Sequence, residues 1–183
     1  MKEVFTPEPL APGSLAAVTS TAESPDATPP RRALLDQAFE LAYRRLGRRD
    51  HTEMQLRERL ERAGFEASLV REVLSTLAAQ GYVDDERFAR RLVEDRRSLD
   101  GWGTRRIRTA LTRAGVAEAT IAQRLDGAAD HDELDAAVSL LASRLRERPC
   151  DEPSRARALG FLLRRGYDSD LAYEAVRRLE RAG

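Results

Sequence analysis

The chain has 183 residues, of which 34% are charged and only 5% aromatic, and its acids and bases balance to a formal net charge of zero. Few large aromatic side chains are available to fill a thick globular interior, so this composition favours a thin, elongated array of helices. A single cysteine, Cys150, excludes an internal disulfide, and no apolar run approaches the about 20 residues that a membrane-spanning helix needs. We therefore expect a protein of the reducing cytoplasm that is neither exported nor inserted into a membrane.

Residues 1–30 differ in composition from the remainder of the chain. They contain six of the eight prolines, interspersed with serine, threonine and alanine, and almost no large apolar residues. A segment of this kind cannot bury enough apolar surface to offset the entropy lost on ordering. We expect residues 1–30 to be a disordered tail.

From Arg31 onward, apolar residues recur at the spacing that is typical of amphipathic helices. The first three stripes comprise Leu35, Ala38, Phe39, Ala42, Tyr43 and Leu46, then Leu56, Leu60 and Ala63, then Leu69, Val70, Val73, Leu74 and Leu77. Thr52, with Gln55 three residues later, predicts a capping box at the start of the second helix. Six further stripes follow, and no segment shows the alternation of a strand, so we expect an all-α fold of nine helices.

Three glycines, Gly64, Gly115 and Gly166, stand 51 residues apart, each with a leucine four residues before it and an apolar residue after it. The pattern predicts that each glycine ends a helix in the left-handed conformation, which a Cβ would strain. Recurrence at one interval indicates three tandem three-helix repeats, at 31–81, 82–127 and 128–183. The function of such an array is expected on a surface that crosses several repeats, because no single repeat encloses a catalytic pocket.

The acidic run Asp84-Asp85-Glu86 is the obvious candidate for acid–base catalysis or a magnesium site. It precedes a helix that we expect to begin near Glu86, where carboxylates cap free amides and meet the positive end of the helix dipole. No second acidic cluster or glycine-rich phosphate loop accompanies it, and His51 and His131 do not make a ligand set. We expect these carboxylates to be structural, and the protein to be no enzyme and to hold no metal or cofactor.

Arginines on the second helix of each repeat are candidates for binding a partner or DNA. Those of the fifth helix lie off the core stripe with no acid among them, and the candidates are Arg105, Arg106, Arg108 and Arg113, together with Arg57 and with Arg155 and Arg157. A charged helix face is commonly just solvated, but a recurring arginine stripe also suits a phosphate backbone or an acidic protein surface. Trp102, between two glycines, could stack on a base, although burial between repeats is the stronger hypothesis.

The strings Arg48-Arg49-Asp50-His51-Thr52-Glu53-Met54-Gln55-Leu56 and Gly81-Tyr82-Val83-Asp84-Asp85-Glu86-Arg87-Phe88-Ala89 make the chain similar to a known family. With Gly64-Phe65, they resemble the RecX family of regulators of the bacterial recombinase RecA. The similarity covers about residues 33–179, is loosest in the third repeat and does not include the proline-rich tail. The residues carried over as a structural signature are Gly81, Tyr82, Asp84, Asp85, Phe88 and Ala89.

The resemblance implies three tandem three-helix repeats, no enzymatic activity and no cofactor. It also implies binding to RecA filaments on single-stranded DNA, along the filament groove or at its growing end, which suppresses ATP hydrolysis, strand exchange and the SOS response. We expect a monomer, with single- or double-stranded DNA as a further candidate partner. From the residues alone two alternatives stay open: a helix-turn-helix-like module that binds DNA directly, and, less well supported, an acid–base enzyme built on Asp84 and Asp85.

Overall fold

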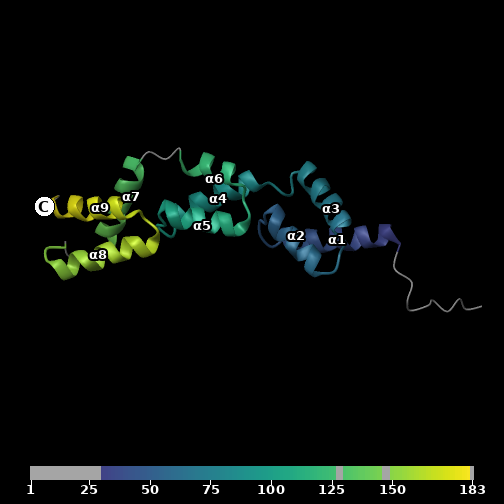
Figure 1. Cartoon of the computed structure of the whole chain (residues 1–183), viewed down its shortest axis with the longest axis horizontal. Coiled ribbons are helices and arrows are strands. Elements are labelled where there is room, and N and C mark those ends of the chain that lie inside the picture. Colours follow the sequence, from purple (N-terminus) through teal and green to yellow (C-terminus); the bar gives the residue numbers. More distant parts are fainter. Residues whose placement is uncertain (1–29, 127–129, 146–148, 182–183) are drawn as a thin grey trace, which may run out of the picture. The chain divides into compact units, whose positions relative to one another are not determined.

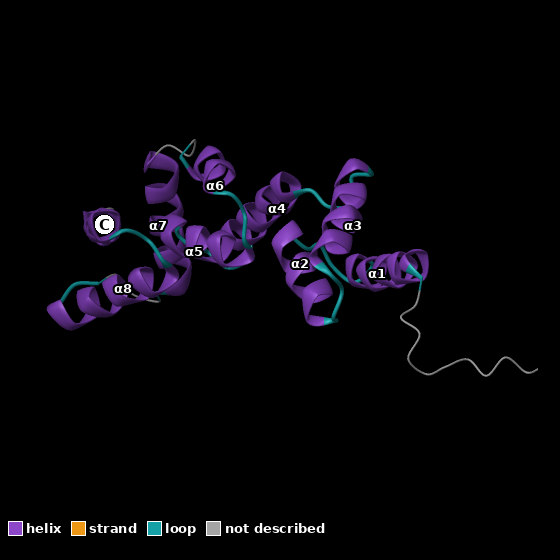
Figure 2. Ribbon diagram, turned by 45° about the vertical axis from the view of Figure 1, so that its right-hand side comes forward, coloured by secondary structure: helices purple, strands orange, loops and turns teal. Residues whose placement is uncertain are grey.

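The computed structural model describes residues 30–126, 130–145 and 149–181, and the chain divides into two units, Met1–Pro30 and Arg31–Gly183. The expected disordered tail, residues 1–30, lies outside the described residues apart from Pro30. The described part of the second unit contains nine α-helices and no strand (Figures 1 and 2), which confirms the predicted fold class. The helices are α1 Arg31–Leu46, α2 Glu53–Arg62, α3 Ala67–Ala79, α4 Asp85–Ser98, α5 Thr104–Ala114, α6 Glu118–Leu125, α7 Asp130–Arg144, α8 Glu152–Arg165 and α9 Ser169–Arg181.

Each group of three successive helices encloses its own apolar core. The first core contains Ala38, Leu56 and Leu74, the second Ile107 and Ile121, and the third Leu141 and Leu162. All the extensive helix–helix contacts join helices of the same group. Burying one such aliphatic side chain contributes roughly 1.5–3 kcal/mol to the free energy of unfolding. Each repeat is therefore stabilised by its own small core, and contacts with the neighbouring repeats add further stability.

The predicted core stripes hold best on α3 and least well in α1 and α2. On α3 all five predicted positions are buried. Tyr43 of α1 is instead 40% exposed and lies outside the core cluster, and its ring meets the Tyr82 ring edge-on at 5.3 Å between centroids. Ala63 is exposed because α2 ends at Arg62, which leaves Ala63 at the C-cap and off the buried stripe.

The three repeat glycines have the left-handed conformation that the sequence predicts. Gly64, Gly115 and Gly166 have φ values of 91°, 82° and 89°. The residue after each glycine donates its N–H to the carbonyl five positions back; the pairs are Phe65 to Leu60, Val116 to Leu111 and Tyr167 to Leu162, at 3.3, 3.1 and 3.2 Å. This bond brings the apolar side chain after the glycine back against the preceding helix, and it satisfies a carbonyl at the end of the second helix of each repeat.

The predicted capping box of α2 forms only in part. The Thr52 hydroxyl accepts the Gln55 N–H at 3.2 Å, as expected. The reciprocal arm is missing because the Gln55 side-chain oxygen lies 3.3 Å from Nδ1 of His51. A complete capping box occurs at α8, where Asp151 and Ser154 each bond the backbone N–H of the other.

Candidate partner-binding surface

The N-terminal end of α2 lies against the C-terminal end of α5, which joins the first repeat to the second (Figure 1). The buried Thr52 hydroxyl accepts the Gln55 N–H and donates to the Ala114 carbonyl at 2.5 Å, so one side chain serves both helix ends. A Cβ on Gly115 would stand 2.5 Å from Met54 Cβ, so the glycine also permits this close approach. The positive end of one helix dipole therefore meets the negative end of the next.

An equivalent junction joins α5 to α8. The Gly103 N–H donates to the Arg165 carbonyl at 2.9 Å, and the Arg105 N–H donates to the Gly166 carbonyl at 3.1 Å. Gly103 stands 51 residues after the threonine of the first junction, and a Cβ there would lie 2.5 Å from the Tyr167 nitrogen. Backbone bonds replace the threonine bond, and they place α8, α5 and α2 end to end.

A carboxylate from the first helix of the following repeat completes each junction. Asp85 accepts the Glu53 N–H at 2.9 Å, and Glu133 accepts both the N–H and the hydroxyl of Thr104 at 2.7 Å. Burial raises the pKa of Asp85, while its bond from Glu53 acts in the opposite direction. The sequence does not reveal these caps, because the donor and acceptor lie 32 and 29 residues apart.

Asp84 and Asp85, which the sequence treats as one acidic cluster, have different partners. Asp84 is the N-cap of α4 and accepts the Arg87 N–H at 2.8 Å. Asp85 is the first residue of α4, one position earlier than the predicted helix start, and it caps α2 as described. Glu86 lies 3.5 Å from Arg124. Within the described residues, no three metal-ligating side chains come together.

The other residues of the family signature form the turn before α4 and the buried face of that helix. Gly81 has a φ of 73° and is exposed, whereas Ala89 is fully buried and Phe88 partly buried. Tyr82 is 52% exposed and contacts only the edge of Tyr43 among the aromatic rings of the described chain. Tyr82 is thus the one signature residue whose large side chain stands mostly in solvent.

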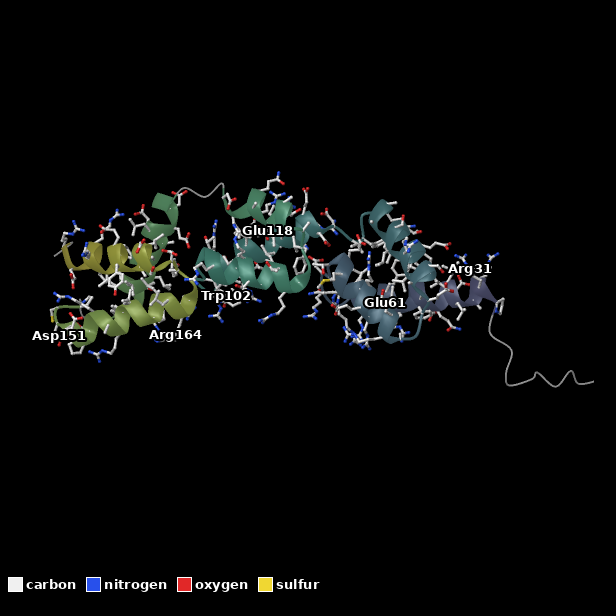
Figure 3. All side chains as sticks on the ribbon, in the orientation of Figure 1. Arg31, Glu61, Trp102, Glu118, Asp151 and Arg164 are labelled. Atoms are coloured by element: carbon white, nitrogen blue, oxygen red, sulfur yellow. The ribbon has the colours of Figure 1, made fainter. Side chains whose placement is uncertain are left out.

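Arg108 is paired, which corrects the prediction that no acid offsets the arginines of the fifth helix. Its guanidinium bridges two acids: Glu118, at the start of α6 (labelled in Figure 3), and Asp126, the latter at 3.0 Å. Only the return of α6 beside α5 brings these acids close. Such partly exposed pairs contribute about 0–1 kcal/mol to stability, but Arg108 no longer counts as an uncommitted charge.

Arg106 is also engaged within the protein. Its guanidinium carbon lies 4.1 Å from the centroid of the Trp102 ring, and that of Arg96 lies 4.8 Å away. Arg106 donates to the Arg164 carbonyl at 3.0 Å, across the junction with the third repeat. Trp102 is half-buried at this junction (Figure 3) and lines a cavity of about 110 Å³ with Tyr167, so its position favours burial between repeats over base stacking.

The remaining arginine candidates divide into paired and free side chains. Arg57 pairs with Glu53, and Arg155 pairs with Glu180 at 2.5 Å. The side chains that form no ion pair with any described residue are Arg105, Arg113 and Arg157, all of them exposed. Among the predicted candidates, these three therefore have a guanidinium group that remains available to an anionic partner.

A denser group of cations, which the sequence pattern did not predict as a site, lies in the first repeat. A cavity of about 230 Å³ between the end of α1 and the face of α2 is lined by Arg45, Arg49, His51, Gln55, Leu56, Glu58, Arg59 and Arg62. We call this site the basic pocket. Two arginine pairs within six residues, Arg44-Arg45 and Arg48-Arg49, were the available signal. Only the packing of α2 against α1 adds Arg59 to them.

These features define a class: an all-α tandem-repeat protein with bonded junctions and arginine-rich surfaces. Three family models match it in order, the first, second and third three-helix domains of RecX, at residues 38–77, 84–125 and 131–176. No helix among the described residues is long and apolar enough to cross a membrane.

Known proteins agree with this class. The regulatory protein RecX of Mycobacterium sp. (strain JLS) is 36% identical over 166 residues, covering 86% of this chain and 89% of that protein. That of Deinococcus radiodurans is 36% identical over 149 residues, covering 81% and 69%. The crystal structure of RecX from Lactobacillus salivarius matches with a TM-score of 0.72 at 16% identity, covering 82% of this chain and 99% of that one. The chain belongs to the RecX family of regulatory proteins.

Proposed function

We propose that the protein regulates the RecA recombinase by binding its filaments on single-stranded DNA. Bound there, it inhibits ATP hydrolysis and strand exchange and restrains the SOS response. The observation that carries the proposal is the match of all three repeats, in order, to the three RecX domains. The partner itself comes from the resemblance, because the fold alone does not name one.

The bonded junctions support a binding role. A filament presents the same surface at regular intervals, and a repeat protein can meet several of these surfaces at once if its own repeats keep their spacing. Backbone bonds from Gly103 and Arg105 and the hydroxyl bond of Thr52 tie successive second helices together. We further propose that the protein acts as a monomer in the cytoplasm, without catalysis or a cofactor of its own.

The uncommitted arginines of α5 are the proposed contacts. Arg105 and Arg113 are exposed and form no ion pair with any described residue. Arg108 is a poor choice for a test, because its reversal would also break its bonds to Glu118 and Asp126. The test therefore reverses only the two free charges.

The experiment measures ATP hydrolysis by the recombinase on single-stranded DNA as the protein is added. Wild type should lower the rate with increasing concentration, and the Arg105→Glu/Arg113→Glu variant should need about 10-fold more protein for half inhibition, most clearly at low salt, where exposed charges are least screened. Arg71→Glu/Arg90→Glu is the matched control, since both arginines are exposed and form no ion pair with any described residue.

Each outcome has one meaning. Coincident inhibition curves for the two double variants would refute the role of α5. A wild-type protein that leaves ATP hydrolysis unchanged would refute the proposed function. Sequence-selective binding to naked duplex DNA together with that result would support the helix-turn-helix alternative.

A further inference from the structure

The basic pocket of the first repeat contains more positive charge than its acids offset. Its lining includes four arginines and one carboxylate, Glu58. Glu58 pairs with Arg62 at 3.0 Å. Arg45, Arg49 and Arg59 form no ion pair with any residue that the structure describes. Three uncommitted guanidinium groups therefore line one cavity of about 230 Å³.

Repulsion among these groups shows in the pKa of Arg45. It is lowered from the ordinary arginine value by Arg59 first, then by burial, and then by Arg48, Arg44 and Arg49. Like charges held this close oppose folding, so the cluster is not explained by the stability of the repeat. A bound anion would remove the repulsion.

The cluster is also not a consequence of the repeat fold. The second repeat has different residues at most of the equivalent positions, 51 residues further on. Those that correspond to Arg45, Arg49, His51 and Arg59 are Arg96, Asp100, Trp102 and Ala110. In the second repeat Asp100 pairs with Arg96, whose guanidinium also lies over the Trp102 ring. In the second repeat this place is thus neutralised and occupied by an indole, so the open basic pocket of the first repeat has no counterpart there.

The donors of the pocket suit phosphate oxygens. Guanidinium groups bind oxyanions through paired N–H donors, and the Gln55 amide adds further donors, as does the His51 ring once it is protonated. Protein interfaces commonly centre on a buried aromatic or aliphatic anchor, but Leu56 is the only apolar residue of the lining and is 1% exposed. The chemistry therefore favours a nucleic-acid backbone over an acidic protein surface.

We infer that the basic pocket binds the phosphodiester backbone of a nucleic-acid strand, with Arg45, Arg49 and Arg59 as the contacting cations. The choice of single-stranded DNA as that strand rests on the proposed function. The pocket is separate from the free arginines of α5, so the two surfaces can be disabled one at a time.

The test measures binding of the full chain to a short fluorescent oligothymidine by anisotropy over a range of salt concentrations. Replacing Arg45 and Arg59 with alanine should weaken binding at least about 10-fold and reduce the salt slope by about 1.4, because each lost contact to a single strand removes about 0.7. Lysine at both positions keeps the charge without the fork, so the salt slope should stay near that of wild type. Arg71→Ala/Arg90→Ala removes the same charge elsewhere and should bind like wild type.

Thermal melting shows whether the variants fold, and the alanine pair should melt no lower than wild type because it relieves repulsion. Equal affinity of the Arg45→Ala/Arg59→Ala and control variants would overturn the inference, as would a wild type that does not bind the oligothymidine. The recombinase assay separates this failure from that of the proposed function. If Arg45→Ala/Arg59→Ala binds DNA normally but no longer inhibits ATP hydrolysis, the pocket contacts protein and the inference is wrong.

Discussion

Replacing Asp85 with alanine should destabilise the junction between the first two repeats by about 1–2 kcal/mol. The carboxylate accepts the Glu53 N–H at 2.9 Å, and that N–H belongs to the first turn of α2, where no intrahelical acceptor exists. The two groups are partly buried, so water only partly replaces the lost bond. Asparagine keeps an oxygen acceptor at the same place and should cost less than alanine.

The pH dependence of the asparagine variant follows from the raised pKa of Asp85. Because the folded-state pKa exceeds the unfolded value, ionising Asp85 lowers the stability of the folded state. This loss is absent below the unfolded pKa and complete above the folded one. Asparagine does not ionise, so the stability of Asp85→Asn relative to wild type should rise as the pH increases from the ordinary aspartate pKa of about 3.9 through the higher folded-state pKa of Asp85.

The assay is thermal melting followed by circular dichroism for wild type and both variants. A loss of 1 kcal/mol should lower the melting temperature by about 2–4 °C in a chain of this size. Asp36→Ala is the control, because Asp36 is exposed on α1 and bonds no described residue, and its effect should stay within about 0.5 kcal/mol. Equal losses for alanine and asparagine at Asp85 would refute the acceptor role, and a relative stability of Asp85→Asn that falls with rising pH would refute the effect of burial.

At the repeat glycines, valine should cost on the order of 1–2 kcal/mol or more because φ is positive. Asparagine should be tolerated at Gly64, where a Cβ meets nothing within 4 Å, but not at Gly166, where it would stand 2.6 Å from the Arg106 nitrogen; equal melting temperatures of the two asparagine variants would contradict this. Lowering the pH from about 8 to about 5 should tighten oligothymidine binding more for wild type than for His51→Gln. In the free protein, burial, followed by the charges of Arg49 and Arg45, lowers the pKa of His51, although its Gln55 bond and Asp50 act in the opposite direction. A bound phosphate favours the protonated ring. An identical pH response of wild type and His51→Gln would rule out a contribution of His51.

The helices and their ends were accessible from the sequence because their causes are local. A left-handed glycine such as Gly115 and a cap such as Asp84 act on residues within one helical turn. The apolar period of α3 likewise needs only neighbouring residues to be recognised. Where that local rule ended, the prediction failed: Ala63 continues the apolar spacing but lies beyond the last turn of α2.

The side-chain partners across the repeats were decided by the tertiary structure. The sequence indicates that Thr52 caps α2, but not that its hydroxyl also bonds Ala114, 62 residues away. It shows four arginines on α5 without an acid beside them, and only the packing of α6 pairs one of the four, Arg108. The basic pocket arises in the same way, since Arg59 belongs to a different helix from Arg45. Apolar periodicity shows which face of a helix is buried. The angle at which helices cross decides which charged side chains meet on the other faces. Because charges interact over several ångströms, these meetings determine which arginines are neutralised within the protein and which remain free for a partner.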